Sequence, residues 1–171
     1  MSNFKEDLTK IKAFVFDVDG VLSAGVLNLN TNGIPIRTAN IKDGYAIHMA
    51  VKLGFPMAII TGGNCKNIIK RYGRLGITDI YMDSFNKLER FNEWIEKKNL
   101  KAKEILYMGD DLPDYPVMNV VGVATAPADA AEEVKSLCKY ISDKKGGEGC
   151  VRDVIEQVMR AQHKWSVDHK W

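Results

Sequence analysis

The sequence predicts an α/β fold in which a parallel, Rossmann-like sheet carries helices on both faces. Short apolar runs of strand length alternate along the chain with longer amphipathic segments of helical spacing. Strands that alternate with helices pair in parallel through right-handed crossovers, and the helices then cover both faces of the sheet. A chain of 171 residues suits a single domain. We expect this domain over residues 1–162, followed by a flexible tail over residues 163–171.

The expected strands are short apolar runs, and the expected helices lie between them. In chain order the strands are KAFVFDVD, PMAIIT, DIYM, EILYMGD, GVAT and KYIS. The helical segments are KDGYAIHMAVKLG, NCKNIIKRYGRLG, NKLERFNEWIEKKNL, DYPVMNV and ADAAEEVKSLC. A last helix begins at about Val151, after a glycine-rich loop over residues 143–150. The third segment has the clearest helical pattern, because Leu88, Phe91 and Ile95 fall on one face.

Residues 26–41 interrupt this alternation and predict a β-hairpin that projects from the sheet. Their sequence, VLNLNTNGIPIRTANI, alternates apolar and polar residues around Asn32 and Gly33. Asn-Gly is the strongest signal for a two-residue hairpin turn, because both positions tolerate positive φ. Pro35 has no N–H group to donate, so it restricts its strand to an edge.

Composition and charge argue against several classes of function. The net charge of +2 and the lack of a block of like charges give no basis for nucleic-acid binding. The apolar runs are too short to span a membrane, and the opening MSNFKEDLTK lacks the apolar core of a signal peptide. Cys65, Cys138 and Cys150 are odd in number and have no metal-ligand spacing. We therefore expect reduced thiols in a cytoplasmic protein with no membrane or nucleic-acid partner.

Polar side chains collect where the predicted strands end. They are Asp17 and Asp19 after the first strand, Thr61 after the second, Lys87 after the third, and Asp110, Asp111 and Asp114 after the fourth. Ligands of an open parallel sheet bind beyond the carboxyl ends of its strands, so residues at these ends meet. Taken singly, an aspartate here could cap a helix, the threonine could stabilise a turn, and the lysine could be solvated. Their conjunction indicates one shared functional site.

The carboxylate cluster predicts a bound cation. Asp17 and Asp19 are spaced i and i+2, so a strand would place these like charges on one face, where they repel. Ligation by oxygen alone, with no histidine or cysteine nearby, favours Mg²⁺. A phosphoryl group could then bind among the metal, Lys87, the Thr61 hydroxyl and backbone N–H groups of glycine turns such as Gly62–Gly63.

The acidic pair also suggests a reaction. One aspartate beside the metal could attack phosphorus and form an aspartyl-phosphate. A second carboxylate could protonate the leaving oxygen and later deprotonate the attacking water. Two rival sites fail on sequence: DVDGVLSAG lacks the third acidic position and the closing Glu of a calcium EF-hand loop, and the chain has no GxxxxGK[ST] motif of a P-loop.

Four elements of the chain, FDVDG, IITG, Lys87 and GDDLPD, resemble in this order the motifs of the haloacid dehalogenase (HAD) phosphatase superfamily. The resemblance implies that Asp17 is the nucleophile and Asp19 the general acid/base. It also implies that Thr61 and Lys87 bind phosphate. The implied magnesium ligands are Asp17, the Asp19 carbonyl and Asp110, with Asp111 or Asp114 in support.

The spacing of these motifs leaves no room for a cap domain, since only about 40 residues separate DVDG from IITG. A capless site admits water unless a macromolecular substrate or a neighbouring subunit closes it. The hairpin followed by NIKDG, together with YMGDDLPD and KKGGEGCVRD, resembles the family of 3-deoxy-D-manno-octulosonate 8-phosphate (KDO 8-phosphate) phosphatases. This resemblance implies a homotetramer whose hairpins pack together, and a sugar-acid phosphate substrate on the route to lipopolysaccharide.

Such a substrate carries a carboxylate distant from its phosphate, so basic residues beyond the metal site are expected. The candidate substrate-binding residues are Gly62, Gly63, Lys42, Lys66 and Arg71. The chain departs from the family at Gly63 and Asn64, where an arginine commonly follows Thr-Gly, and Lys66 is a candidate replacement. Three alternatives remain: a phosphatase of the nine-carbon KDN 9-phosphate, an inactive HAD scaffold, and a receiver domain with Asp83 as phosphoacceptor.

Overall fold

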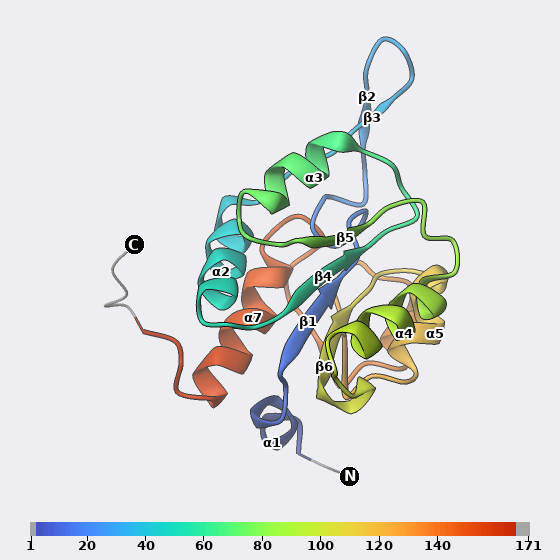
Figure 1. Cartoon of the computed structure of the whole chain (residues 1–171). Helices are drawn as coiled ribbons and strands as arrows, with labels where there is room; N and C mark the ends of the chain where they lie inside the picture. Colours follow the sequence, from blue (N-terminus) through green and yellow to red (C-terminus); the bar gives the residue numbers. More distant parts are fainter. Residues whose placement is uncertain (1–2, 167–171) are drawn as a thin grey trace.

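A six-stranded parallel sheet forms the centre of the protein (Figure 1), whose computed structural model describes residues 3–166. Its strands are β1 (Ala13–Phe16), β4 (Met57–Ile60), β5 (Asp79–Tyr81), β6 (Ile105–Met108), β7 (Val123–Ala126) and β8 (Tyr140–Ile141). The helices are α1 (Phe4–Thr9), α2 (Ile41–Lys52), α3 (Lys66–Gly73), α4 (Lys87–Lys97), α5 (Tyr115–Met118), α6 (Glu132–Lys135) and α7 (Cys150–Ala161). A second sheet pairs β2 (Asn28–Leu29) with β3 (Pro35–Ile36). The predicted α/β class is confirmed.

The strand order β5-β4-β1-β6-β7-β8 places β1 between β4 and β6, and all neighbouring strands are parallel. Phe16 at the end of β1 lies opposite Ile59 of β4 and Met108 of β6. The three strands therefore end at the same level, and the residues that follow them share one edge of the sheet.

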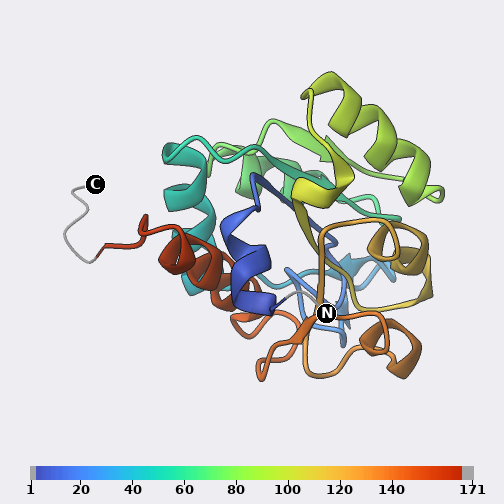
Figure 2. The same ribbon diagram turned by 90° about the horizontal axis from the view of Figure 1, so that it is seen from below.

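Side chains of β1 alternate between two hydrophobic layers. Phe14 and Phe16 belong to a core shared with α1, α2, α3 and α7, whereas Ala13 and Val15 belong to a core that includes Trp94 of α4. Figure 1 shows α2 and α7 on one side of the sheet and α4 and α5 on the other, and Figure 2 shows α1 beside α7. Burial on both faces explains why β1 is apolar throughout rather than alternating.

The hairpin projects from the sheet as predicted, but its turn is wider than predicted (Figure 1). Asn30 donates its N–H to Ile34 O at 3.0 Å, so three residues form the turn instead of two. The Asn30 side chain accepts the N–H groups of Asn32 and Ile34, both at 2.9 Å, and this stabilises the longer turn. Gly33 has a φ of 72°, and Asn32 is not among the residues of positive φ.

The two ends of the described chain pack on the α2–α7 side of the sheet. Helix α1, which the sequence did not indicate, begins after the cap residue Asn3 and buries Leu8. Near the other end, Arg152 lies 4.5 Å from the centre of the Trp165 ring, and Tyr45 packs edge-on against that ring. The rest of the predicted tail, from residue 167, lies outside the described residues. Between residues 3 and 166, none of the helices is both long and apolar enough to cross a bilayer.

Candidate active site

The polar residues predicted at the strand ends surround one cavity of about 410 Å³. Those that line it are Asp17, Asp19, Thr61, Gly62, Gly63, Lys87, Asp110, Asp111 and Asp114. They come from the ends of β1, β4 and β6 and from the first residue of α4. The exposed ring of Phe85 lines the same cavity. The sheet thus brings these segments together as the parallel topology requires.

A buried lysine lies between two aspartates at the floor of the cavity. Lys87 Nζ is 2.7 Å from Asp17 Oδ2 and 2.7 Å from Asp114 Oδ1, and its side chain is only 3% exposed. Asn86 caps α4 by accepting the N–H of Glu89, which fixes the helix end that carries the lysine. The ammonium group therefore serves a buried ion-pair network rather than solvent.

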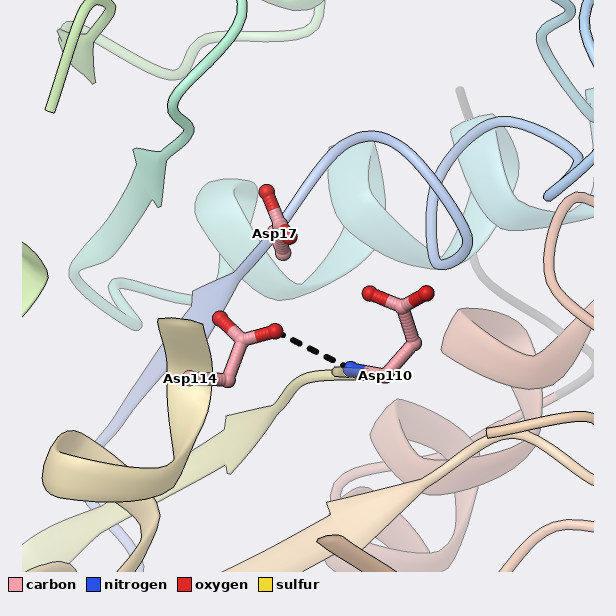
Figure 3. A group of neighbouring side chains, drawn as sticks. All are labelled: Asp17, Asp110 and Asp114. Carbon is pink, nitrogen blue, oxygen red and sulfur yellow. Dashed lines mark hydrogen bonds between the residues drawn. The ribbon is translucent and has the colours of Figure 1, made fainter. Parts of the chain in front are cut away.

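Asp114 is held by hydrogen bonds to both of its oxygens. Its Oδ1 also accepts the hydroxyl of buried Tyr107 at 2.6 Å. Its Oδ2 accepts the backbone N–H of Asp110 at 3.1 Å (Figure 3) and that of Asp111 at 3.4 Å. A carboxylate with this many donors has a fixed orientation. Asp114 therefore orders the turn after β6 and directs Lys87 toward Asp17.

Three carboxylates in this site can share a cation. Figure 3 shows Asp17, Asp110 and Asp114 gathered beyond β1 and β6, and one oxygen from each lies within 4.8 Å of the others. Burial, and then the charge of Asp114, raises the pKa of Asp17 to about 7, against the opposing effect of Lys87. Burial and the charges of Asp17 and Asp114 raise the pKa of Asp110 to about 8. Burial alone would lower the pKa of Lys87, but the two neighbouring carboxylates raise it.

Three carboxylates share this cluster with one lysine, so the cluster can carry more negative charge than the lysine balances. An all-oxygen donor set of this kind suits a hard divalent cation such as Mg²⁺. A Cβ on Gly20 would lie 1.9 Å from Asp110 Oδ2, and Gly20 has a φ of 79°. Only glycine combines that backbone conformation with so close an approach. The glycine of DVDG therefore makes room for the third carboxylate.

Asp19 points to a partner that the sequence did not indicate. Arg37 Nε donates to Asp19 Oδ1 at 2.7 Å, and Arg37 Nη2 donates to Asp19 Oδ2 at 2.8 Å. This hydrogen bonding raises the pKa of Arg37 further. A signal was available, because Arg37 is the one charged residue in positions 26–41. Tyr107 gave no such signal, since a tyrosine within an apolar run is typical of a buried strand.

The basic residues predicted to bind substrate lie outside this cavity in the single chain. Lys42 lines a second cavity of about 340 Å³ beside α7. Lys66 is an exposed residue at the start of α3. Arg71 lies against α2, where a Cβ on Gly44 would be 2.5 Å from its Nη2. The single chain therefore brings together the residues predicted to bind the phosphate group. It does not bring Lys42, Lys66 and Arg71, the three predicted to bind the substrate carboxylate, into the same cavity.

The glycine-rich loop supports the segment that follows β1. Gly147 donates its N–H to Val21 O at 2.8 Å. A Cβ on Gly146 would lie 2.0 Å from Gly20 O, and one on Gly147 would lie 2.5 Å from Ala24 N. The backbones touch without side chains between them, so these glycines are required for packing.

Comparison with known proteins identifies the family. Residues 63–155 match a family model described as haloacid dehalogenase-like hydrolase. The 3-deoxy-D-manno-octulosonate 8-phosphate phosphatase KdsC of Escherichia coli K12 is 39% identical over 154 residues, which cover 90% of this chain and 82% of the relative. The chain belongs to the KDO 8-phosphate phosphatase family of HAD-like hydrolases. The resemblance found in the sequence motifs is thereby confirmed.

Solved structures of KDO 8-phosphate phosphatases share this fold. A crystal structure from Yersinia pestis has a TM-score of 0.90 and 34% identity, and the match covers 94% of this chain and 86% of that one. A structure from Moraxella catarrhalis, in complex with magnesium, phosphate and KDO, has a TM-score of 0.89 and 31% identity, with 93% and 91% covered. The predicted enzyme class, a phosphatase of the HAD superfamily, is confirmed, and the receiver-domain alternative is excluded.

Proposed function

We propose that this phosphatase hydrolyses KDO 8-phosphate to KDO and phosphate, with Mg²⁺ as its cofactor and Asp17 as its nucleophile. The observation that supports this most is the cluster of Asp17, Asp110 and Asp114 around buried Lys87. A family member from Moraxella catarrhalis was solved with magnesium, phosphate and KDO together. The proposed metal ligands are Asp17, Asp110 and the carbonyl of Asp19. Asp111 and Asp114 support them.

In the proposed first step, Asp17 attacks phosphorus and an aspartyl-phosphate forms. The bond between phosphorus and the sugar oxygen breaks, and Asp19 gives that oxygen its proton. In the second step Asp19 takes a proton from water, whose oxygen attacks phosphorus. The bond from phosphorus to Asp17 then breaks and phosphate leaves. When bound, Mg²⁺ neutralises the carboxylates and polarises the phosphoryl oxygens.

The remaining cavity residues are proposed to hold the phosphoryl group. The Thr61 hydroxyl and the N–H groups of Gly62 and Gly63 follow β4 and border the same cavity. Lys87 adds a positive charge that its burial leaves poorly screened. Together they would favour the transition state, in which charge spreads over the transferred oxygens.

A neighbouring subunit is proposed to complete the site, in a cytoplasmic homotetramer that supplies lipopolysaccharide precursors. The hairpin exposes apolar side chains, with Val26 87% and Leu29 63% exposed. Exposed apolar surface of this kind favours association with another chain. Lys42, Lys66 and Arg71 lie outside the cavity of their own chain, so their proposed contact with the substrate carboxylate requires such assembly.

The test is phosphate release from a panel of sugar-acid phosphates that includes KDO 8-phosphate and KDN 9-phosphate, with Mg²⁺ or with EDTA. We expect KDO 8-phosphate to give the highest kcat/KM, and activity to depend on Mg²⁺. Asp17→Asn should abolish turnover, whereas Glu132→Gln, at a glutamate whose side chain is 87% exposed and which lines neither cavity, should retain it. Acid quenching should trap phosphate on the wild-type peptide that contains Asp17. Full activity of Asp17→Asn would refute the assignment of the nucleophile.

A further inference from the structure

The hairpin contributes Arg37, whose side chain is largely buried, beside Asp19 at the rim of the active site. The two hydrogen bonds from Arg37 to Asp19 form a fork in which each nitrogen meets one carboxylate oxygen. The Arg37 side chain is 8% exposed, whereas that of Asp19 is 37% exposed. A paired guanidinium of this geometry restricts a carboxylate in both position and rotation. The side chain of Arg37 is therefore held within the protein, while the carboxylate of Asp19 that it binds lines the cavity.

The turn after β4 leaves space for the guanidinium group of Arg37. A Cβ on Gly63 would lie 2.5 Å from Arg37 Nη2 and 3.2 Å from Asp19 Oδ2. Gly63 has no unusual positive φ, so its backbone conformation does not require glycine. The space that it leaves is occupied by Arg37.

The backbone next to Arg37 is fixed to the same loop that carries Asp19. Thr38 donates its N–H to Ser23 Oγ at 2.9 Å, and its own hydroxyl accepts the N–H of Ala24 at 3.0 Å. The backbones of Ser23 and Asp19 also form an isolated β-bridge. The base of the hairpin and the loop after β1 are therefore joined by hydrogen bonds. They hold Arg37 at a fixed position relative to Asp19.

We infer that Arg37 is a positioning residue for proton transfer, which holds the carboxylate of Asp19 at the edge of the cavity. This inference rests on the proposed role of Asp19 as general acid/base. An aspartate that is one-third exposed samples several rotamers unless a partner restrains it. Proton transfer needs the carboxylate within hydrogen-bond reach of the leaving oxygen, and a displacement of about 1 Å can cost about a hundredfold in rate. The hairpin thus contributes to the chemistry of its own chain.

Leaving groups of different basicity test this role. A sugar alkoxide needs a proton to depart, whereas p-nitrophenolate departs without one. The value of kcat/KM reports the steps up to this departure. Arg37→Ala should therefore lower kcat/KM for a sugar phosphate at least tenfold more than for p-nitrophenyl phosphate. Arg37→Lys should recover part of the loss, because a lysine supplies charge without the fork.

Two further variants complete the experiment. Asp19→Asn sets the reference, and the double variant Asp19→Asn/Arg37→Ala should be within threefold of Asp19→Asn alone, since Arg37 acts through Asp19. Arg74→Ala removes a charge from an exposed arginine and should show no dependence on the leaving group. Thermal unfolding measured on each variant separates loss of folding from loss of positioning.

The outcomes divide cleanly. Equal losses of Arg37→Ala on both esters, or additive losses in the double variant, would overturn the inference while leaving the role of Asp19 intact. If Asp19→Asn itself shows no dependence on the leaving group, the proposed role of Asp19 falls and the inference about Arg37 falls with it.

Discussion

Replacement of Lys87 by methionine would remove the positive charge at the floor of the cavity while keeping an unbranched side chain of similar size. Lys87 Nζ lies 2.7 Å from an oxygen of Asp17 and from an oxygen of Asp114. At an effective dielectric constant of about 20, each contact corresponds to about 6 kcal/mol of Coulomb attraction. Most of this attraction offsets the cost of burying the charges, and removal of one partner from a buried pair costs about 3–5 kcal/mol.

We therefore expect Lys87→Met to lower the free energy of unfolding by about 3–5 kcal/mol at pH 7 in EDTA. In saturating Mg²⁺ the loss should be smaller, because a cation that binds the folded cluster stabilises it and supplies part of the missing charge. The measurement is urea unfolding followed by circular dichroism, with wild type and variant each in EDTA and in Mg²⁺. Turnover should fall in both conditions, since Lys87 is also proposed to bind phosphate.

Lys97→Met is the matched control for this prediction. Lys97 Nζ lies 3.1 Å from Asp79 Oδ1, but its side chain is 64% exposed. Exposed ion pairs contribute little, because water and salt screen them. The two substitutions are chemically identical, so only burial and partners differ. Equal destabilisation by both, or a Lys87→Met deficit that Mg²⁺ does not narrow, would refute the account of the cluster.

Two other predictions concern a glycine and a buried aspartate. Gly20→Ala should reduce Mg²⁺ affinity and turnover at least tenfold by displacing Asp110, whereas Gly33→Ala, at a φ of 72° with nothing within 4 Å, should affect stability alone. Calorimetric titration with Mg²⁺ distinguishes them, and equal affinities would contradict the prediction. Burial raises the pKa of Asp43 to about 6, so the folded state binds the extra proton and stability should fall as pH rises from about 4 to 6. In Mg²⁺, the wild type should lose up to about 3 kcal/mol of unfolding free energy over this pH range, and Asp43→Asn should not show that loss. Urea midpoints of wild type and variant that change in parallel from pH 4 to 8 would contradict this prediction.

The central strands were predictable because they are buried on both faces. In β1, β4 and β6 every residue is buried, which produces the continuous apolar runs seen in the sequence. Helix α1 was not predictable in this way, because its six residues are too few for a periodic pattern and its packing depends on contact with α7, which is far away in the chain. The hairpin turn differed from its Asn-Gly signal because Asn30 competes for the N–H groups of the turn.

The candidate site was predictable where strand ends determine it. Asp17 and Asp110 follow neighbouring parallel strands, so topology alone brings them together. Arg37 lies in the hairpin and Asp19 in the loop after β1, and the relative placement of these segments depends on contacts at the base of the hairpin. No helical or strand pattern in the sequence predicts that contact. Tyr107 donates from within an apolar strand, where its hydroxyl is indistinguishable in sequence from a core residue.

The backbone contact of the glycine-rich loop also bears on synthesis of the protein. Val21, just after the acidic pair, accepts hydrogen bonds from Gly147 N–H and from Cys150 Sγ, which is 129 positions away in the chain. During synthesis, the loop after β1 leaves the ribosome long before Gly147 and Cys150 do. It therefore lacks these contacts while most of the sheet has already been synthesised. Messages cut short just before this stretch would yield chains that contain every proposed catalytic side chain yet lack activity. Completion of the site is thus tied to completion of the polypeptide.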